Sequence, residues 1–260
     1  AFRLCGAILM LLTIDKPSVF IWSMLYFVTG LIPCAVSVGL VNRELGRWIF
    51  KWKFIKAEFL EGFYFSVSQS SQSIYNEIDK TLLASLTTLE LAGLYTAAYR
   101  FIDFSYAPIS GLLISSYANF FRRGADGITG SLAWARKIIP YAAAYGLSAA
   151  LVLYLISGFI PLVLGSAYND TTAILRWLAP LIIFKSVELL IANILTGAGY
   201  QGIRTAIQLG LAILSSLTAV WLISVSGWLG AVIASLGSSI LAVLSFSFAV
   251  FILLRKQKAA

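Results

Sequence analysis

The feature that most constrains this chain is its succession of apolar runs of about twenty residues, the length at which an α-helix crosses a ~30 Å hydrocarbon core. Hydrocarbon offers no water to an exposed backbone N–H or C=O group, so a spanning segment must be a helix or part of a closed barrel. Barrel strands alternate apolar and polar residues, and these runs do not. The sequence therefore predicts an all-α, polytopic transmembrane helical bundle.

Composition agrees with this interpretation and excludes several kinds of site. Hydrophobic residues make up 60% and charged residues 12% of the 260 residues, far outside the soluble range. The formal charge of +8 could indicate nucleic-acid binding, but membrane proteins collect Lys and Arg on cytoplasmic loops, so no nucleic-acid partner is expected. The chain has no histidine, and its cysteines, Cys5 and Cys34, lie in apolar runs. We therefore expect no metal site, disulfide or cofactor.

Hydropathy and helix-breaking residues predict seven complete spans and one partial span. They cover residues 1–14 (partial), 18–41, 58–87, 92–120, 134–157, 172–196, 204–224 and 228–254. Basic residues concentrate on every second connection, around 42–58, 122–137, Arg204 and the C-terminal segment, whereas the connections between these contain one Lys, Lys16. This alternation predicts a cytoplasmic C-terminus. The partial first span and the missing initiator Met predict that the chain is a fragment.

The connection 42–58 is the longest basic one and the best candidate boundary. Trp48, Trp52 and Phe54 lie among its Lys and Arg residues, a pattern typical of a short amphipathic helix on the inner leaflet. Six spans of similar length follow it and form a natural unit. No outer connection is long enough for an extramembrane catalytic domain, so the sequence predicts a protein that is not an enzyme.

The third span contains the most polar stretch of the chain, SVSQSSQSIYNEIDK at 66–80. On a helical wheel its apolar arc holds Phe63, Val67, Ile74, Tyr75 and Ile78, with Ser71 among them. The opposite side carries a polar stripe, flanked by Gln72, Asp79 and Glu77: Ser66, Gln69, Ser73, Asn76 and Lys80. Hydrogen bonds between helices could account for the serines. The larger groups predict a water-filled cavity inside the bundle.

Charged residues inside the predicted spans indicate the same cavity, since each costs ~2.5–3.5 kcal/mol at mid-membrane. Asp79 and Arg100 lie at similar depth on either side of a turn near Glu90, so we expect them to face each other. Lys185 and Glu188, like Arg100 and Asp103, are spaced i, i+3 on one helix face. An alternative is that these charges form structural ion pairs that set helix register. Tyr95, Tyr99 and Tyr106 share a face with Asp103 and either line the cavity or pack.

Two segments resemble a known family. The run YNEIDKTLLASLTTLELAGLYTAAYRFIDFSYAPISGLLISSYANFFRR, 75–123, resembles the hallmark region of bacterial O-antigen (Wzx-type) polysaccharide flippases of the multidrug/oligosaccharidyl-lipid/polysaccharide exporter superfamily. Its matching residues are Asp79, then Gly93, Leu94, Tyr95, Ala98, Tyr99 and Arg100, then Phe120 to Arg123. Residues 165–199 also resemble the family. One departure is Pro108, which lies earlier than the family's usual proline.

The resemblance implies two six-helix lobes around a central cavity. Residues 1–41 would be the end of the N-terminal lobe, 42–58 a cytoplasmic inter-lobe linker, 59–254 the C-terminal six-helix lobe and 255–260 a cytoplasmic tail. The implied function is translocation of undecaprenyl-diphosphate-linked oligosaccharide units across the bacterial cytoplasmic membrane, with membrane lipid and other polysaccharide-assembly proteins as partners.

Within this cavity we expect one set of residues to bind substrate and another to form ion pairs or couple transport to an ion. The acidic set is Asp79, Asp103 and Glu188. The substrate set is Lys80, Arg100, Lys185, Gln69, Gln72, Ser73, Asn76 and Tyr99.

Two other functions remain open. A multidrug or cation antiporter of the same superfamily would use the cavity carboxylates, so a net positive cavity would favour the flippase. A membrane polysaccharide polymerase or glycosyltransferase would need a long outer loop or an acidic sugar-nucleotide motif, and the sequence contains neither.

Overall fold

The computed structural model describes residues 18–46 and 52–259 and confirms the predicted all-α helical bundle. No strand occurs among these residues. The chain divides into two compact units, residues 1–57 and 58–260, and each is described by itself.

In the first unit the structure describes helix α2 (Val19–Leu45), which matches the predicted span 18–41. The Ser18 hydroxyl caps it by accepting a hydrogen bond from the Ile21 N–H at 3.3 Å. The segment Phe20–Glu44 is long and apolar enough to cross a membrane. The predicted partial span 1–14 lies outside the described residues.

The predicted short amphipathic helix within 42–58 is wrong where the structure describes it. Residues up to Leu45 continue α2, and Trp52 already begins helix α3 (Trp52–Leu86). Extending a formed helix adds a hydrogen bond for each residue fixed, and from Trp52 onward no Pro or Gly interrupts the sequence before Gly62. Trp48 lies outside the described residues. The division between the units falls at Ala57, inside the predicted linker.

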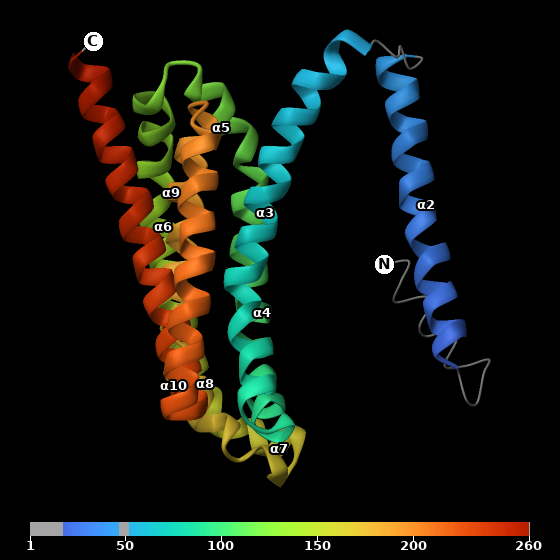
Figure 1. The fold of residues 1–260 in the computed structure, drawn as a ribbon, viewed down its shortest axis with the longest axis vertical. Helices are drawn as coiled ribbons and strands as arrows, with labels where there is room; N and C mark the ends of the chain where they lie inside the picture. The colour runs from blue at the N-terminus through green and yellow to red at the C-terminus, as the bar shows by residue number, and fades with distance from the viewer. Residues whose placement is uncertain (1–17, 47–51, 260) are drawn as a thin grey trace. The chain divides into compact units, whose positions relative to one another are not determined.

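The second unit opens with two long helices joined by a tight turn (Figure 1). Helix α3 ends at Leu86 and helix α4 (Leu89–Ser115) begins after Thr88, whose hydroxyl accepts a hydrogen bond from the Leu91 N–H at 3.2 Å. The chain then forms the short helix α5 (Tyr117–Gly124) and the long helix α6 (Ile128–Ile156). The predicted span 92–120 is therefore two helices.

The predicted span 172–196 is also broken. After short turns and helix α7 (Ile160–Leu164), helix α8 (Thr171–Leu178) stops before Pro180, and helix α9 (Leu181–Gly197) follows. Proline has no N–H to donate, so it sits most easily at the start of a helix rather than inside one.

Helix α10 (Gln201–Ala259) contains both remaining predicted spans. Gly227 interrupts it with φ 56°, a conformation that L side chains rarely adopt, and the chain reverses direction there (Figure 1). The two arms meet closely at the turn, since a Cβ on Gly230 would lie 2.0 Å from the Leu222 carbonyl oxygen. The expected pair of spans, 204–224 and 228–254, is thus an antiparallel hairpin.

Small residues allow the helices of this unit to pack closely. A Cβ on Gly124 of α5 would lie 1.9 Å from the Gly197 carbonyl oxygen of α9, and one on Gly146 of α6 would lie 2.9 Å from the Ile183 Cα. Helix association in lipid depends on such close approach because the surrounding hydrocarbon is as apolar as leucine.

The second unit is strongly asymmetric in charge. Helix α5, which carries Arg122 and Arg123, lies at the same end of the bundle as the C-terminal end of α10, which carries Arg255 and Lys256 (Figure 1). The connections at the opposite end, 87–88, 157–170 and Gly227, contain no Lys or Arg. Within the described residues, four helical stretches are long and apolar enough to span a membrane: Phe20–Glu44, Ile128–Leu164, Thr171–Gly197 and Gln201–Gln257. The chain is a multi-pass membrane protein, and within the second unit α3 and α4 run alongside α9 and α10 (Figure 1).

The close approach of α5 and α9 makes Gly124 sensitive to substitution. We expect Gly124→Ala to destabilise the protein by about 1–3 kcal/mol, because the new methyl group would meet a backbone carbonyl that cannot move aside. Thermal unfolding of the purified protein measures this, and Gly111→Ala is the control, since nothing lies within 4 Å of its Cβ position. Equal melting temperatures for the two variants would contradict the packing.

Candidate functional site

The polar residues of α3 divide into a buried row and an exposed row. The buried row faces the other helices and consists of Ser68, Ser71, Tyr75 and Asp79, and the apolar Leu83 continues it. Of the predicted polar stripe, Ser66, Gln69 and Ser73 are exposed and Asn76 and Lys80 are half-buried.

Tyr75 and Ser71, which the helical wheel places in the apolar arc, are buried in the bundle. The polar stripe is not enclosed by the helices of its own unit. Polar side chains of this size are costly against hydrocarbon, so this face is suited to contact with water or with other protein.

Asp79 lies in the buried row and is tied to two other helices. Its Oδ2 accepts hydrogen bonds from the Tyr95 hydroxyl of α4 at 2.5 Å and from the Ser235 hydroxyl of α10 at 2.6 Å. The Lys80 backbone N–H donates to Oδ1 at 2.9 Å. These donors satisfy a carboxylate that is only 3% exposed.

The predicted pairing of Asp79 with Arg100 is wrong. The α3–α4 turn is centred on Thr87 and Thr88 rather than near Glu90, so Tyr95 is the residue level with Asp79. Arg100 follows Tyr95 by five residues and therefore points about 140° further round α4. Its side chain is exposed, and no described carboxylate lies within ion-pair distance of it.

Two lysines from different helices converge on one tyrosine. The Nζ of Lys80, from α3, lies 3.7 Å from the ring centroid of Tyr99, and the Nζ of Lys185, from α9, lies 4.8 Å from it. Tyr99 itself is 2% exposed on α4. Such cation–π contacts stabilise an ammonium group by about 0.5–2 kcal/mol and hold both charges in one place. Lys80 also pairs with Glu77 at 2.8 Å, the one ion pair within the described residues.

A small polar cavity of about 60 Å³ lies beside Lys185. Glu188 is buried there and accepts a hydrogen bond from the Tyr75 hydroxyl, while its other oxygen, Oε2, has no partner. The side chains that surround the cavity come from α3, α4 and α9: Gln72, Tyr75, Asn76, Tyr106, Lys185, Glu188 and Leu189. Lys185 and Glu188, although spaced i, i+3, form no ion pair.

The structure thus brings together about half of the predicted site. Lys80, Tyr99 and Lys185 meet directly, and Gln72, Asn76 and Glu188 adjoin them. We name these six residues the two-lysine cluster. Asp103 is exposed one turn after Tyr99 on α4 and forms no ion pair with a described residue. Gln69 and Ser73 lie on the exposed face of α3, Asp79 is bonded toward α10, and no contact joins Arg100 to the cluster.

Arg204 was expected in a connection but is buried in the first turns of α10. Its Nη1 donates to Asn193 Oδ1 at 3.2 Å and to Thr196 Oγ1 at 2.8 Å, both near the C-terminal end of α9. The exposed carbonyl groups of a helix C-terminus favour a cation, which explains a buried Arg204 without a described acidic partner. The i, i+4 spacing of Arg204 and Gln208 in an apolar segment was the signal available in the sequence; Gln208 accepts a hydrogen bond from Ser68.

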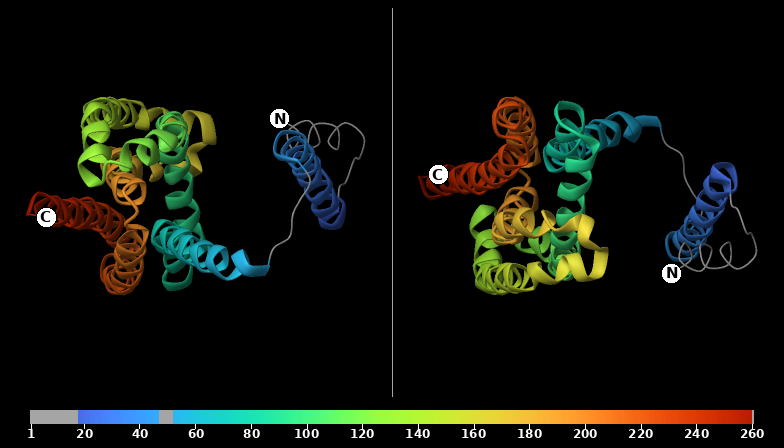
Figure 2. Two further views of the ribbon diagram at one scale, coloured as in Figure 1. Left: turned by 90° about the horizontal axis from the view of Figure 1, so that it is seen from above. Right: turned by 90° about the horizontal axis from the view of Figure 1, so that it is seen from below.

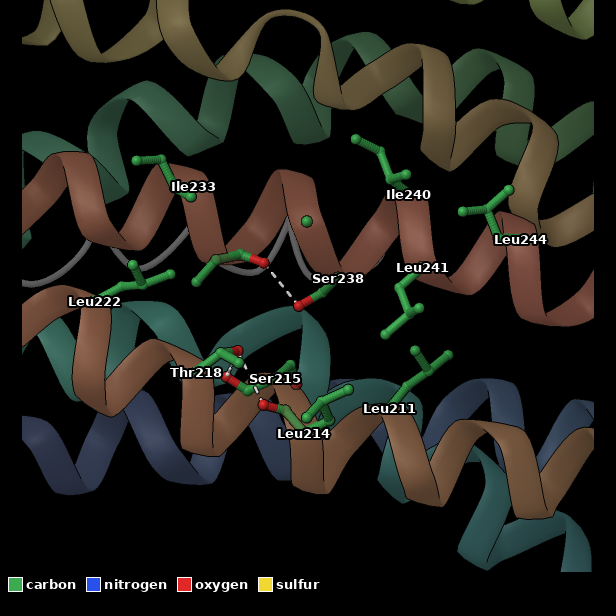
Figure 3. A pocket seen from close by; sticks show the side chains of 12 residues that line it. Leu211, Leu214, Ser215, Thr218, Leu222, Ile233, Ser238, Ile240, Leu241 and Leu244 are labelled. Atoms are coloured by element: carbon green, nitrogen blue, oxygen red, sulfur yellow. Dashed lines mark hydrogen bonds between the residues drawn. The ribbon is translucent and has the colours of Figure 1, made fainter.

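A larger groove of about 370 Å³ lies between the two arms of α10 (Figure 3). Its polar lining residues hydrogen-bond to carbonyl groups of their own helix: Ser215 to Ala212 at 3.2 Å, Thr218 to Leu214 at 2.9 Å and Ser238 to Ala234 at 2.7 Å. The remaining lining is mostly leucine and isoleucine, so this groove offers apolar surface and is not a candidate polar site.

The hydrogen bond from Tyr95 to Asp79 can be tested by removing one hydroxyl. Tyr95→Phe leaves a buried carboxylate with one donor fewer, so we expect a loss of about 1–3 kcal/mol of stability. Thermal unfolding is the measurement, with Tyr141→Phe as a control that removes a hydroxyl from an exposed ring. The loss of stability caused by Tyr95→Phe should be smaller in an Asp79→Asn background. An unchanged loss in that background would show that it does not come from the bond to Asp79.

Comparison with known proteins adds no relative. No protein-family model, curated protein or solved structure matches this chain. The membrane-spanning helical fold rests on the described helices, and the two-lysine cluster rests on the distances above. The flippase resemblance of residues 75–123 stays a hypothesis.

Proposed function

We propose that this protein is a lipid-linked oligosaccharide flippase, which moves undecaprenyl-diphosphate-linked repeat units across a bacterial cytoplasmic membrane. The observation that carries the proposal is the convergence of Lys80 and Lys185 on Tyr99, beside the exposed polar stripe of α3. This arrangement offers an anion site and a sugar-compatible surface on neighbouring parts of one membrane-spanning unit.

The polar stripe is suited to a glycan. Its exposed members, Ser66, Gln69 and Ser73, carry hydroxyl and amide groups that can replace water around sugar hydroxyls. From Ser66 to Lys80 the stripe extends over about 21 Å of helix, most of a ~30 Å hydrocarbon core. A glycan that followed this stripe would avoid contact with hydrocarbon, while the isoprenoid tail would remain in the lipid.

The two lysines are suited to the diphosphate. Lys80 shares its charge with Glu77, whereas Lys185 has no described carboxylate within ion-pair distance. Lys185 is therefore the principal candidate to attract the diphosphate, with Lys80 in support. Arg100 is exposed on α4 and outside the two-lysine cluster, so its contribution would be smaller.

A cation antiporter is a second candidate because of Glu188. This carboxylate is 4% exposed, has one unpartnered oxygen and borders the 60 Å³ cavity. A buried group of this kind could couple transport to a proton or cation, alongside Asp79 or Asp103. The two lysines beside Glu188 favour an anionic substrate over a cationic drug. We therefore propose that Glu188 couples transport to a proton or cation and does not bind the substrate.

The remaining parts of the proposal follow from the charge asymmetry and the bundle. The basic end, with Arg122, Arg123, Arg255 and Lys256, would face the cytoplasm together with the C-terminus. Translocation would proceed by alternating access, without a bond made or broken. Membrane lipid and other polysaccharide-assembly proteins are the expected partners, and no nucleic acid is expected.

Surface polysaccharide in a flippase-null bacterium tests the substrate. We expect Lys185→Ala to reduce surface glycan at least about tenfold while the protein level in the membrane is unchanged, since one lost ion contact of ~1.4 kcal/mol changes affinity tenfold. Lys80→Ala should have a smaller effect. Lys256→Ala removes the same charge from the exposed C-terminal segment and serves as the control. Wild-type glycan in both cluster variants would exclude the diphosphate role.

Thiol labelling tests whether the polar stripe meets water. In a background with Cys5 and Cys34 replaced by Ala, we expect Gln69→Cys and Ser73→Cys to react with a membrane-impermeant maleimide. Ile74→Cys is the matched control, because Ile74 is also exposed in the second unit, at 48%, but lies on the apolar side of α3. Equally fast reaction of Ile74→Cys would show that water reaches the apolar side of α3 as readily as the stripe, and this would contradict a water-filled route along the stripe.

A further inference from the structure

A second cleft lies where the first turns of α6 meet the last turns of α10. It has a volume of about 410 Å³ and is lined by Thr129, Leu132, Ala133, Arg136, Phe251, Leu254 and Arg255. The last turns of α10 and helix α3 lie on opposite sides of the unit (Figure 2). This cleft is therefore separate from the two-lysine cluster, and we name it the two-arginine cleft.

The two-arginine cleft is positively charged and has no acidic lining residue. Arg136 and Arg255 are both exposed, and neither forms an ion pair with a carboxylate of the described chain. The Arg255 guanidinium lies 4.4 Å from the ring centroid of Phe251, which holds it over the cleft wall. Two arginines that line one cleft without a counter-charge repel each other, so an anion bound between them would be stabilising.

Hydrogen bonds from Gln257 hold together the two helices that form the cleft. Its Oε1 accepts a hydrogen bond from the Thr129 N–H at 3.3 Å, and its Nε2 donates to the Asp126 carbonyl oxygen at 3.2 Å. These bonds fasten the end of α10 to the beginning of α6, so the two arginines are presented from fixed helices.

Away from the two arginines, the wall of the cleft is mostly apolar. Leu132, Phe251 and Leu254 form it, and the cleft lies at the basic end of the bundle, where two spanning helices end. This is the depth at which headgroups meet hydrocarbon, and at which long basic side chains extend toward the headgroups. A ligand that fits has a compact anionic group at one end and hydrocarbon at the other.

We propose that the two-arginine cleft binds an anionic phospholipid of the leaflet at the basic end, with its phosphate between Arg136 and Arg255. Guanidinium groups match phosphate oxygens with paired hydrogen bonds, and the acyl chain lies along Leu132, Phe251 and Leu254. The neighbouring cleft, lined by Arg123, Lys137 and Asp126 among others, carries an acidic side chain that offsets its basic ones, so it is the weaker site.

Lipid binding to the purified full chain tests the proposal. Native mass spectrometry and thermal unfolding compare phosphatidylglycerol with phosphatidylcholine of the same acyl chains. We expect the wild type to retain phosphatidylglycerol and to gain stability from it. Arg136→Gln combined with Arg255→Gln should weaken this binding about tenfold or more. Arg122→Gln combined with Lys256→Gln removes equal charge from the same end outside the cleft and should bind like the wild type.

Three outcomes would overturn the proposal. The first is equal retention of phosphatidylglycerol and phosphatidylcholine by the wild type. The second is an equal loss of phosphatidylglycerol binding in the cleft variant and the control variant. The third is displacement of the lipid by soluble glycerol 3-phosphate at comparable concentration, which would show that the acyl chain contributes nothing to binding. Should the cleft variant fold poorly, a salt titration of the wild type decides instead. Phosphatidylglycerol binding that does not weaken from 0.05 to 0.5 M salt, a range over which exposed charges become screened, would exclude the arginine contacts.

Discussion

Hydrogen bonds between polar side chains attach α3 to the rest of its bundle, and the arrangement of the site depends on them. Ser68 bonds to Gln208 of α10, Tyr75 to Glu188 of α9, and Asp79 to Tyr95 of α4 and Ser235 of α10. In lipid the hydrophobic effect does not favour helix association, so close packing and such bonds provide the attraction. Because the bonds run to three different helices, they set both the depth and the rotation of α3.

That rotation separates structural polar groups from exposed ones on the same helix. Both carboxylate oxygens of Asp79 accept hydrogen bonds inside the bundle, so this residue has a structural role. The next residue, Lys80, instead contacts Tyr99 and Glu77 at the edge of the bundle. One residue along a helix is a turn of about 100°, enough to move a side chain from a buried row to an accessible one. The face that Lys80 shares with Asn76 and Ser73 thereby becomes the polar surface on which the transport proposal depends.

The two basic sites of this unit differ in chemistry and in place. The lysines of the two-lysine cluster come from α3 and α9 and lie over an aromatic ring near polar amides, an arrangement that suits an anionic group with sugars attached. The two-arginine cleft combines guanidinium groups with an apolar wall at the bundle end, which suits a resident lipid. For the proposed transport of a lipid-linked substrate, two separate sites would keep the substrate apart from the anionic lipids of the surrounding membrane.

Apolar run length and the positions of Gly and Pro determined the helical membrane fold, the hairpin at Gly227 and the approximate limits of most spans, because these depend on local backbone chemistry and on the thickness of hydrocarbon. Sequence also indicated Lys80, Lys185 and Tyr99 as exceptional residues for a membrane interior. Only the tertiary structure decided which of them meet. The predicted pair of Asp79 with Arg100 failed because the turn ends two or three residues earlier than expected and a helix rotates by about 100° at each residue, so a small error in register sends a side chain to another neighbour. The burial of Arg204 was likewise a tertiary outcome, since its stabilising partners, Asn193 and Thr196, belong to a different helix.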